Sequence, residues 1–304
     1  MNVHRQLLFV VFVAMLMLLG CKNNITHSAS YGKAYEVVVI NDIDSLLYNT
    51  LSVPMKGLPQ IEPTFDVVEI TSDKLKGDSK LVRNIVVLTI DKRQKRVDIS
   101  SKQNVYAQPQ VIINIVAPSQ SSLQIFLKKY GNELRNYLIK TELHRAQGDI
   151  ARQTNVKAAS TIYKMFGIRM QVPPELTTSK VGKNFLWLSN NASSGMVNLC
   201  IYSIGKGKFA QERDSVMRKN ILGEQKEMYM RTASIVSMVH GKYNSVTIRG
   251  LWEMQNDAMG GPFVAYWKPN GKRIVVTEVF VYAPETKKRN LVRRLEAALY
   301  TRNK

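Results

Sequence analysis

The stretch Val111-Ile-Ile-Asn-Ile-Val-Ala-Pro118 runs from an apolar strand pattern through Ala-Pro into the start of a helix pattern. The stretch Val279-Phe-Val-Tyr-Ala-Pro284 has the same order near the end of the chain. Because each half closes on this pattern, the sequence predicts an α+β fold of two similar subdomains, at residues 34–152 and 160–304. Each subdomain is expected to be an antiparallel sheet with amphipathic helices packed on one face, and an internal duplication is a hypothesis.

The helix after Pro118 has the clearest pattern in the chain. Ser119 is a suitable N-cap, because its hydroxyl can accept a hydrogen bond from an amide of the first turn. Apolar residues then recur at spacings of three and four, which predicts a helix that extends to about Ile150 with one face in the core. The residues of this face are Leu123, Phe126, Leu127, Tyr130, Leu134, Tyr137 and Leu138.

A second amphipathic helix is expected after Pro284. Its inward residues are Leu291, Val292, Leu295, Ala298 and Leu299. Its other face is strongly basic, and a basic face of this kind is normally solvated. We therefore expect an exposed face that consists of Lys287, Lys288, Arg289, Arg293, Arg294 and Arg302.

Shorter apolar runs between turn residues predict the remaining strands. In the first half, strands are expected at 35–40, 65–70, 83–91, 97–101 and 111–116, with a helix over 43–51. In the second half, strands are expected at 168–172, 185–189, 197–204, 246–254, 263–267 and 273–282, with a helix over 210–229. The pair Asn270-Gly271 predicts a hairpin between the last two strands.

The start of the chain has the layout of a lipoprotein signal. Arg5 supplies a positive charge, and an apolar run follows over residues 7–19 and ends in Gly20-Cys21. This run is shorter than the roughly 20 residues that a membrane span needs. We expect residues 1–20 to be a signal peptide and the Cys21 thiol to carry a diacylglycerol after cleavage. An ordinary secretory signal and an uncleaved N-terminal helix are the alternatives.

Residues 21–33 are small and polar, which is typical of a flexible tether between a membrane and a folded body. Lys22 is not the acidic residue that commonly retains lipoproteins in the inner membrane, so we expect an outer membrane lipoprotein that faces the periplasm. The only other cysteine is Cys200, which lies in an apolar stretch. It is expected to be a buried and unreactive thiol.

The chain has a formal net charge of +20, and removal of Arg5 with the signal peptide leaves about +19 (20 − 1). Such an excess favours a polyanionic neighbour. Behind a secretion signal, the expected partners are the membrane itself, anionic lipids or acidic glycans. Nucleic acid is not expected, because the basic runs are not interleaved with the clustered aromatic residues on which bases stack.

The stretch Gly250-Leu-Trp-Glu-Met-Gln-Asn-Asp-Ala-Met-Gly-Gly-Pro-Phe263 has the composition of a ligand site, with a tryptophan beside polar groups and paired glycines. Strand alternation places Ile248, Gly250, Trp252 and Met254 on one face. The alternative is a structural hairpin that buries Trp252. The candidate ligand-binding residues are Arg249, Trp252, Glu253, Asn256, Asp257, Gly260, Gly261 and Glu278, and Arg249 is the expected partner of Glu278.

Motifs that carry catalysis or bind a cofactor are scarce. The histidines His27, His144 and His240 have no second ligand at metal-binding spacing, so no metal and no cofactor are expected. We therefore expect a non-catalytic binding or scaffolding role in the cell envelope. The alternative is a hydrolase that acts on an acidic envelope polymer with Glu253, Asp257 or Glu278 as paired carboxylates.

The segment from Trp252-Glu-Met through Asn256-Asp-Ala-Met-Gly-Gly-Pro-Phe263 resembles a family of uncharacterised lipoproteins from Bacteroidetes-type bacteria, known as a domain of unknown function. The Gly20-Cys21 boundary and the strand pattern Ala34-Tyr-Glu-Val-Val-Val39 fit the same family. The resemblance covers the whole mature chain. It implies an envelope lipoprotein, and it brings no activity, cofactor or catalytic residue with it.

Overall fold

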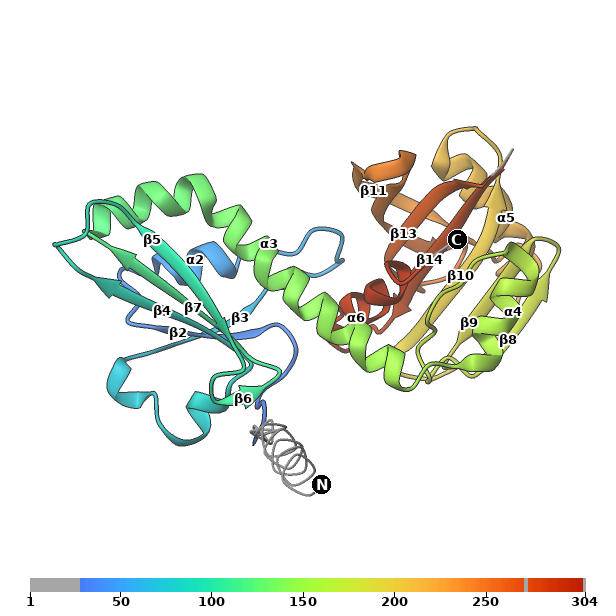
Figure 1. Cartoon of the computed structure of the whole chain (residues 1–304). Helices are drawn as coiled ribbons and strands as arrows, with labels where there is room; N and C mark the ends of the chain where they lie inside the picture. Colours follow the sequence, from blue (N-terminus) through green and yellow to red (C-terminus); the bar gives the residue numbers. More distant parts are fainter. Residues whose placement is uncertain (1–27, 271–272, 303–304) are drawn as a thin grey trace, which may run out of the picture.

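The computed structural model describes residues 28–270 and 273–302, which form an α+β structure with five α-helices and three sheets. Figure 1 shows two domains that are joined by the long helix α3. The smallest sheet is a parallel pair of β1 (Ser28–Ala29) and β6 (Ala107–Gln108). The predicted signal peptide, Cys21 and part of the tether lie outside the described residues, as does Gly271.

The first domain contains a mixed five-stranded sheet of order β3-β2-β4-β7-β5. The first four of these strands are parallel, and β5 is antiparallel to β7 at the edge. Short 3-10 helices at Ser72–Lys74 and Gly77–Leu81 connect β3 to β4. The strands are β2 (Glu36–Ile40), β3 (Asp66–Ile70), β4 (Asn84–Ile90), β5 (Asp98–Gln103) and β7 (Val111–Ala117).

Both faces of this sheet are covered, which explains why its central strands are apolar along their length. On one face, Val86 and Leu88 pack under α2 (Leu46–Leu51) and the first half of α3. On the other face, Ile85 packs with Val82 and Leu75 from the connection between β3 and β4. Strands that are buried on both faces are typical of parallel sheets.

The second domain contains an antiparallel seven-stranded sheet of order β11-β12-β13-β14-β10-β9-β8. A 3-10 turn at Lys242–Asn244 lies between β11 and β12. The strands are β8 (Thr178–Gly182), β9 (Phe185–Ser189), β10 (Met196–Ile204), β11 (Met230–His240), β12 (Val246–Met254), β13 (Gly260–Asn270) and β14 (Arg273–Tyr282). The pairing of β13 with β14 confirms the predicted hairpin.

Helices cover the two faces of this second sheet unequally. α4 (Val156–Phe166), α6 (Arg289–Leu299) and the end of α3 pack on one face in a continuous apolar core. The opposite face is covered by α5 (Phe209–Asn220), which contributes Phe209 and Met217 to a separate core. Because α5 has only 12 residues, it leaves part of its face uncovered.

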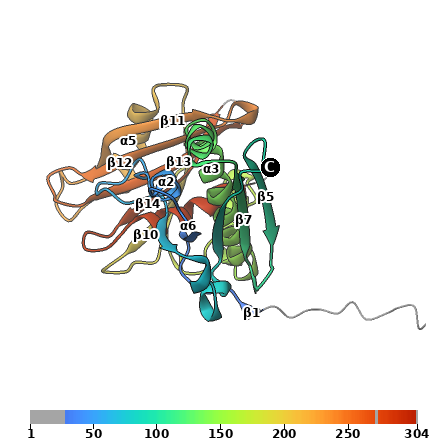
Figure 2. The same cartoon turned by 90° about the vertical axis from the view of Figure 1, so that its left-hand side faces the viewer.

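Helix α3 (Gln120–Arg152) spans the two domains (Figures 1 and 2). Its 33 residues make it about 50 Å long. Leu123 and Leu138 pack in the core of the first domain, whereas Ile150 packs in the core of the second. Ser119 caps the helix by accepting a hydrogen bond from the Ser122 amide, as predicted. No helix within residues 28–270 and 273–302 is both long and apolar enough to span a membrane.

The prediction of two similar subdomains, each an antiparallel sheet with helices on one face, is wrong. The first sheet is mostly parallel, and the second is antiparallel with helices on both faces. The shared Ala-Pro pattern reflects a local event, because in each domain a buried strand ends and a helix returns over the sheet. It does not specify how the other strands pair.

Two predicted elements of the second domain differ in the structure, and two observed elements were not predicted. The helix expected over 210–229 ends at Asn220, and the unpredicted edge strand β11 follows. Residues 168–172 form no strand. The Val172 amide donates to the Thr154 hydroxyl and the Val172 carbonyl accepts from the Asn155 amide, so neither group pairs with a neighbouring strand. Helix α4 was not predicted either, although Asn155 caps its start.

Candidate functional site

An apolar pocket of about 390 Å³ lies on the face of the second sheet that α5 leaves uncovered. Its walls come from β9, β10, β12 and β14 and from the two loops after α5 and after β12. Its aromatic residues are Trp187, Trp252, Phe280 and Tyr282. Its methionines are Met196, Met228, Met254 and Met259.

The two tryptophans have their polar atoms satisfied within the protein. The indole Nε1–H of Trp252 donates to the Val281 carbonyl at 3.3 Å, and that of Trp187 donates to Asn198 Oδ1 at 2.9 Å. The Phe280 ring lies 5.4 Å from the Trp252 ring in an edge-to-face arrangement. The tryptophans therefore contribute apolar ring surface to the pocket.

The glycine pair fixes Trp252 through close packing of backbone. A Cβ atom on Gly261 would lie 2.1 Å from the Val281 carbonyl oxygen and 3.2 Å from Trp252 Nε1. A Cβ atom on Gly260 would lie 2.9 Å from the Trp252 carbonyl oxygen. Since real Cβ atoms do not approach so closely, both positions need glycine for packing reasons, and neither glycine lines the pocket.

The polar residues of the predicted site lie at or near the rim of this pocket. Asp257 lines the pocket, is exposed and accepts a hydrogen bond from the Ala258 amide at 2.6 Å. Asn256 has a positive φ of 58° in the same turn and lines an adjoining polar pocket with Arg218 and Tyr229. Among the predicted residues, the structure thus brings Trp252, Asp257 and Asn256 together.

Glu253 and Glu278 lie apart from these residues. Glu253 forms an exposed ion pair with Arg231 across β11 and β12, with a distance of 2.7 Å between its Oε1 and Arg231 Nε. Glu278 is fully buried under α5. No three histidine, cysteine, aspartate or glutamate side chains in the described part of the chain are placed to hold a metal ion.

The partner of Glu278 is Arg213, not Arg249. Arg213 on α5 donates from Nη2 to Glu278 Oε1 at 2.7 Å, and the Tyr202 hydroxyl donates to Glu278 Oε2 at 2.6 Å. Burial opposes the charged form of Arg213, but the charge of Glu278 raises its pKa above the ordinary value. Burial and then Glu278 raise the pKa of Cys200 as well, which fits an unreactive thiol.

Arg249 points to the opposite face of the sheet, where it forms an ion pair with Glu296 of α6. Glu296 also binds Arg293 at 3.0 Å and accepts a hydrogen bond from the Tyr300 hydroxyl at 2.8 Å. Burial alone would raise the pKa of Glu296, but the charges of Arg249 and Arg293 lower it below the ordinary value. Arg249 is therefore part of the packing around α6.

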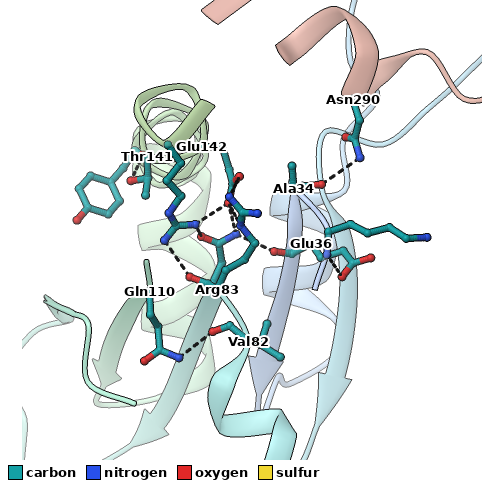
Figure 3. A network of polar contacts seen from close by, with 12 residues as sticks. Ala34, Glu36, Val82, Arg83, Gln110, Thr141, Glu142 and Asn290 are labelled. Atoms are coloured by element: carbon teal, nitrogen blue, oxygen red, sulfur yellow. Dashed lines mark hydrogen bonds and ion pairs between the residues drawn. The ribbon is translucent and has the colours of Figure 1, made fainter. Parts of the chain in front are cut away.

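Glu142 of α3 is a further buried glutamate, and like Glu296 it binds two arginines (Figure 3). Its carboxylate lies 2.6 Å from Arg145 Nη1 and 2.9 Å from Arg83 Nη2, and it accepts a hydrogen bond from Asn84 Nδ2 at 2.7 Å. In the same view, Asn290 of α6 donates to the Ala34 carbonyl of the first domain at 3.1 Å.

The expectation of a solvated basic face on the last helix is wrong for three residues. Lys288, Arg289 and Arg293 are buried, because the first domain covers them. Glu62 of the first domain accepts hydrogen bonds from the amides of Lys288 at 2.7 Å and Arg289 at 3.0 Å, and so caps α6. The Arg289 guanidinium lies 2.6 Å from Asp66, whose pKa it lowers against the effect of burial.

Most of the pocket residues were not predicted from the sequence. Trp187 and Met196 lie on β9 and β10, far in sequence from the 250–263 stretch, and Met228 lies in a segment that was expected to be helical. The available signal was the pairing of methionine and tryptophan at alternating strand positions. That signal could not show which strands are neighbours.

We predict that Glu278→Gln destabilises the protein by about 3 kcal/mol or more, because it leaves the Arg213 charge buried without its partner. Chemical denaturation at neutral pH measures this free energy of unfolding. The matched control is Glu253→Gln, which breaks an exposed pair and should change the free energy of unfolding by less than about 1 kcal/mol. Equal effects of the two substitutions would contradict the role of Glu278.

We predict that Glu296→Gln destabilises the protein by about 3 kcal/mol at neutral pH, since it leaves Arg249 and Arg293 without their carboxylate. The folded-state pKa of Glu296 is lowered, so its contribution is complete above the ordinary glutamate value of 4.5 and is lost as the pH falls below it. Denaturation curves of the wild type and the variant should therefore converge on acidification. A difference that stays constant below pH 4.5 would exclude this linkage.

Each half of the chain is similar to a protein family of unknown function. Residues 30–151 match Domain of unknown function (DUF8532), and residues 155–301 match Domain of unknown function (DUF4837). The human StarD13 (DLC2) lipid transfer and protein localization domain matches at 7% identity and a TM-score of 0.20, over 40% of this chain and 88% of that chain, which is too weak a likeness for any conclusion. No curated protein matches the sequence. The chain is thus similar to two domain families of unknown function in succession, one over each half.

Proposed function

We propose that this protein is a lipid-anchored, non-catalytic binding protein of the cell envelope, and that the pocket around Trp252 binds an apolar ligand. The observation that carries the proposal is the set of aromatic and methionine side chains that face the pocket. Its volume of about 390 Å³ lies within the range of small-molecule sites in proteins.

The chemistry of the pocket favours a neutral apolar group such as an acyl chain. Methionine side chains are flexible and adapt to ligands of different shape. The exposed Glu224 and Asp257 at the rim disfavour an anionic group beside the mouth. The proposed ligand therefore presents a hydrocarbon portion to the tryptophans and carries no negative charge next to these carboxylates.

The envelope location rests on the sequence from Arg5 to Cys21. A diacylglycerol on Cys21 would hold the two domains at a membrane, and we propose the periplasmic side of an outer membrane. Apolar molecules concentrate in and near membranes, so this location brings the pocket close to its class of ligand.

The hydrolase alternative receives no support from the positions of its carboxylates. Glu278 is buried and bound to Arg213, and Glu253 is bound to Arg231. Of the three acidic residues, Asp257 is the one that lines the apolar pocket. The second carboxylate of this pocket is Glu224, which is exposed at the rim and is not one of the acidic residues of that alternative.

We predict that the N-terminal peptide of the protein from membrane fractions carries a diacyl or triacyl modification on Cys21. Mass spectrometry of that peptide measures the modification directly. The Cys21→Ala variant should be absent from the lipid-modified fraction. An unmodified mature N-terminus in the wild type would remove the anchor while leaving the pocket proposal to its own test.

We predict that a chain beginning at Lys22, which keeps every described residue, binds the neutral dye N-phenyl-1-naphthylamine with a saturable rise in fluorescence. Met228→Glu and Met259→Glu should weaken binding by about tenfold or more, because each places a charge that needs solvation in the apolar lining. Met238→Glu, on the exposed edge strand β11, is the matched control and should bind as the wild type does.

Two results would contradict the pocket proposal. One is a wild-type chain that shows no saturable dye binding. The other is an equal loss in the Met238 control, which would indicate binding to exposed apolar surface rather than in the pocket. Thermal unfolding of each variant shows that the fold is intact, so a loss of binding can be assigned to the site.

A further inference from the structure

Three connections of the second domain lie beside the described ends of β13 and β14, at one end of its sheet. They are the β8–β9, β10–α5 and β11–β12 connections. The strand registers show this, because Tyr202 pairs with Phe185, Ile204 with Ile274, His240 with Val246, and Val246 with Trp267. We call this end the basic edge, and its cations are Lys183, Lys206, Lys208, Lys242, Lys268 and Arg273.

The basic edge has a large excess of positive charge. Five of its six cations are exposed and Lys268 is half-buried. The described residues at this end of the sheet, at 182–185, 204–208, 240–246, 268–270 and 273, include no aspartate or glutamate. The carboxylate that does lie beside it, Glu212 of α5, accepts a hydrogen bond from the Gly205 amide at 3.0 Å. The edge therefore has a positive field that favours an anionic neighbour.

Exposed apolar and aromatic side chains accompany these cations. The Tyr243 side chain is 81% exposed at the tip between β11 and β12, and Lys268 Nζ lies 5.4 Å from its ring centroid. Val239 and Met238, just before this tip, are 61% and 47% exposed. Protein surfaces that contact the membrane–water interface commonly combine a tyrosine, aliphatic groups and lysines, as this edge does.

We propose that the basic edge docks on an anionic phospholipid bilayer. The lysines would pair with headgroup phosphates, and Tyr243 with Val239 would enter the headgroup region. The apolar residues decide between a bilayer and a soluble acidic polymer, because a hydrated polymer offers them no apolar environment. This contact is separate from the anchor on Cys21 and from the pocket around Trp252.

The test uses the chain that begins at Lys22, so that no acyl group contributes to binding. Cosedimentation with vesicles of equal parts phosphatidylcholine and phosphatidylglycerol should show binding, and pure phosphatidylcholine should show little. The variant Lys206→Gln/Lys208→Gln/Lys242→Gln should bind the mixed vesicles about a hundredfold more weakly. Salt screens the charges but leaves the apolar contact of Tyr243, so Tyr243→Ser should weaken the binding that the wild type keeps at high salt.

The matched control is Lys92→Gln/Lys95→Gln/Arg96→Gln, in the exposed turn before β5 of the first domain. It removes the same charge and should change vesicle binding by less than about threefold. An equal loss in both triple variants would overturn the proposal, since the net charge alone would then explain binding. Wild-type binding to polyphosphate with no binding to the mixed vesicles would also overturn it, in favour of a soluble polyanion.

Discussion

The carboxylate of Glu62 at the start of α6 is the contact on which the arrangement of the two domains depends. Glu62 lies on a loop of the first domain. Its carboxylate accepts hydrogen bonds from the amides of Lys288 and Arg289, where α6 of the second domain begins, more than two hundred residues later in the chain. The contact holds α6 between α3 and the sheet, where Ile150 of α3 joins the same core. With three helices on that face, the opposite face keeps only α5, and this difference in coverage leaves room for the apolar pocket.

Local patterns in the sequence predicted the elements better than their arrangement. The limits of α3 follow from an N-cap serine and a three-to-four spacing, which a single segment contains. The pairing of strands depends on segments far apart in the chain. The runs that contain Val86 and Ile113 lack the alternation of apolar and polar residues that a half-exposed strand shows. Such continuous apolar runs are typical of a parallel sheet that is buried on both faces. Strand β11 was missed because an exposed edge strand has no apolar alternation to detect.

The candidate site shows the same division between local and distant information. Alternation along β12 correctly predicted that Ile248, Gly250, Trp252 and Met254 share a buried face. The predicted pair of Arg249 and Glu278 is wrong, because the strand registers place these two residues on opposite faces of the sheet. The cations of α6 were assigned to solvent because buried arginines are rare. Glu62 and Asp66, which bind Lys288 and Arg289, lie on a loop and a strand of the other domain, and no pattern within α6 can reveal them. Arg293 pairs instead with Glu296 of α6 itself.

The pocket and the basic edge lie at opposite ends of one rigid sheet. The pocket is lined by the start of β10 and the ends of β12 and β14, whereas the edge is built on the turns at the other end of the same strands. None of the six cations of the edge lines the pocket, so substitutions of these cations and of the pocket residues should act independently. A bilayer that contacts the edge would lie at the end of the sheet away from the residues that line the pocket. Surface charge and pocket chemistry would then act on different neighbours.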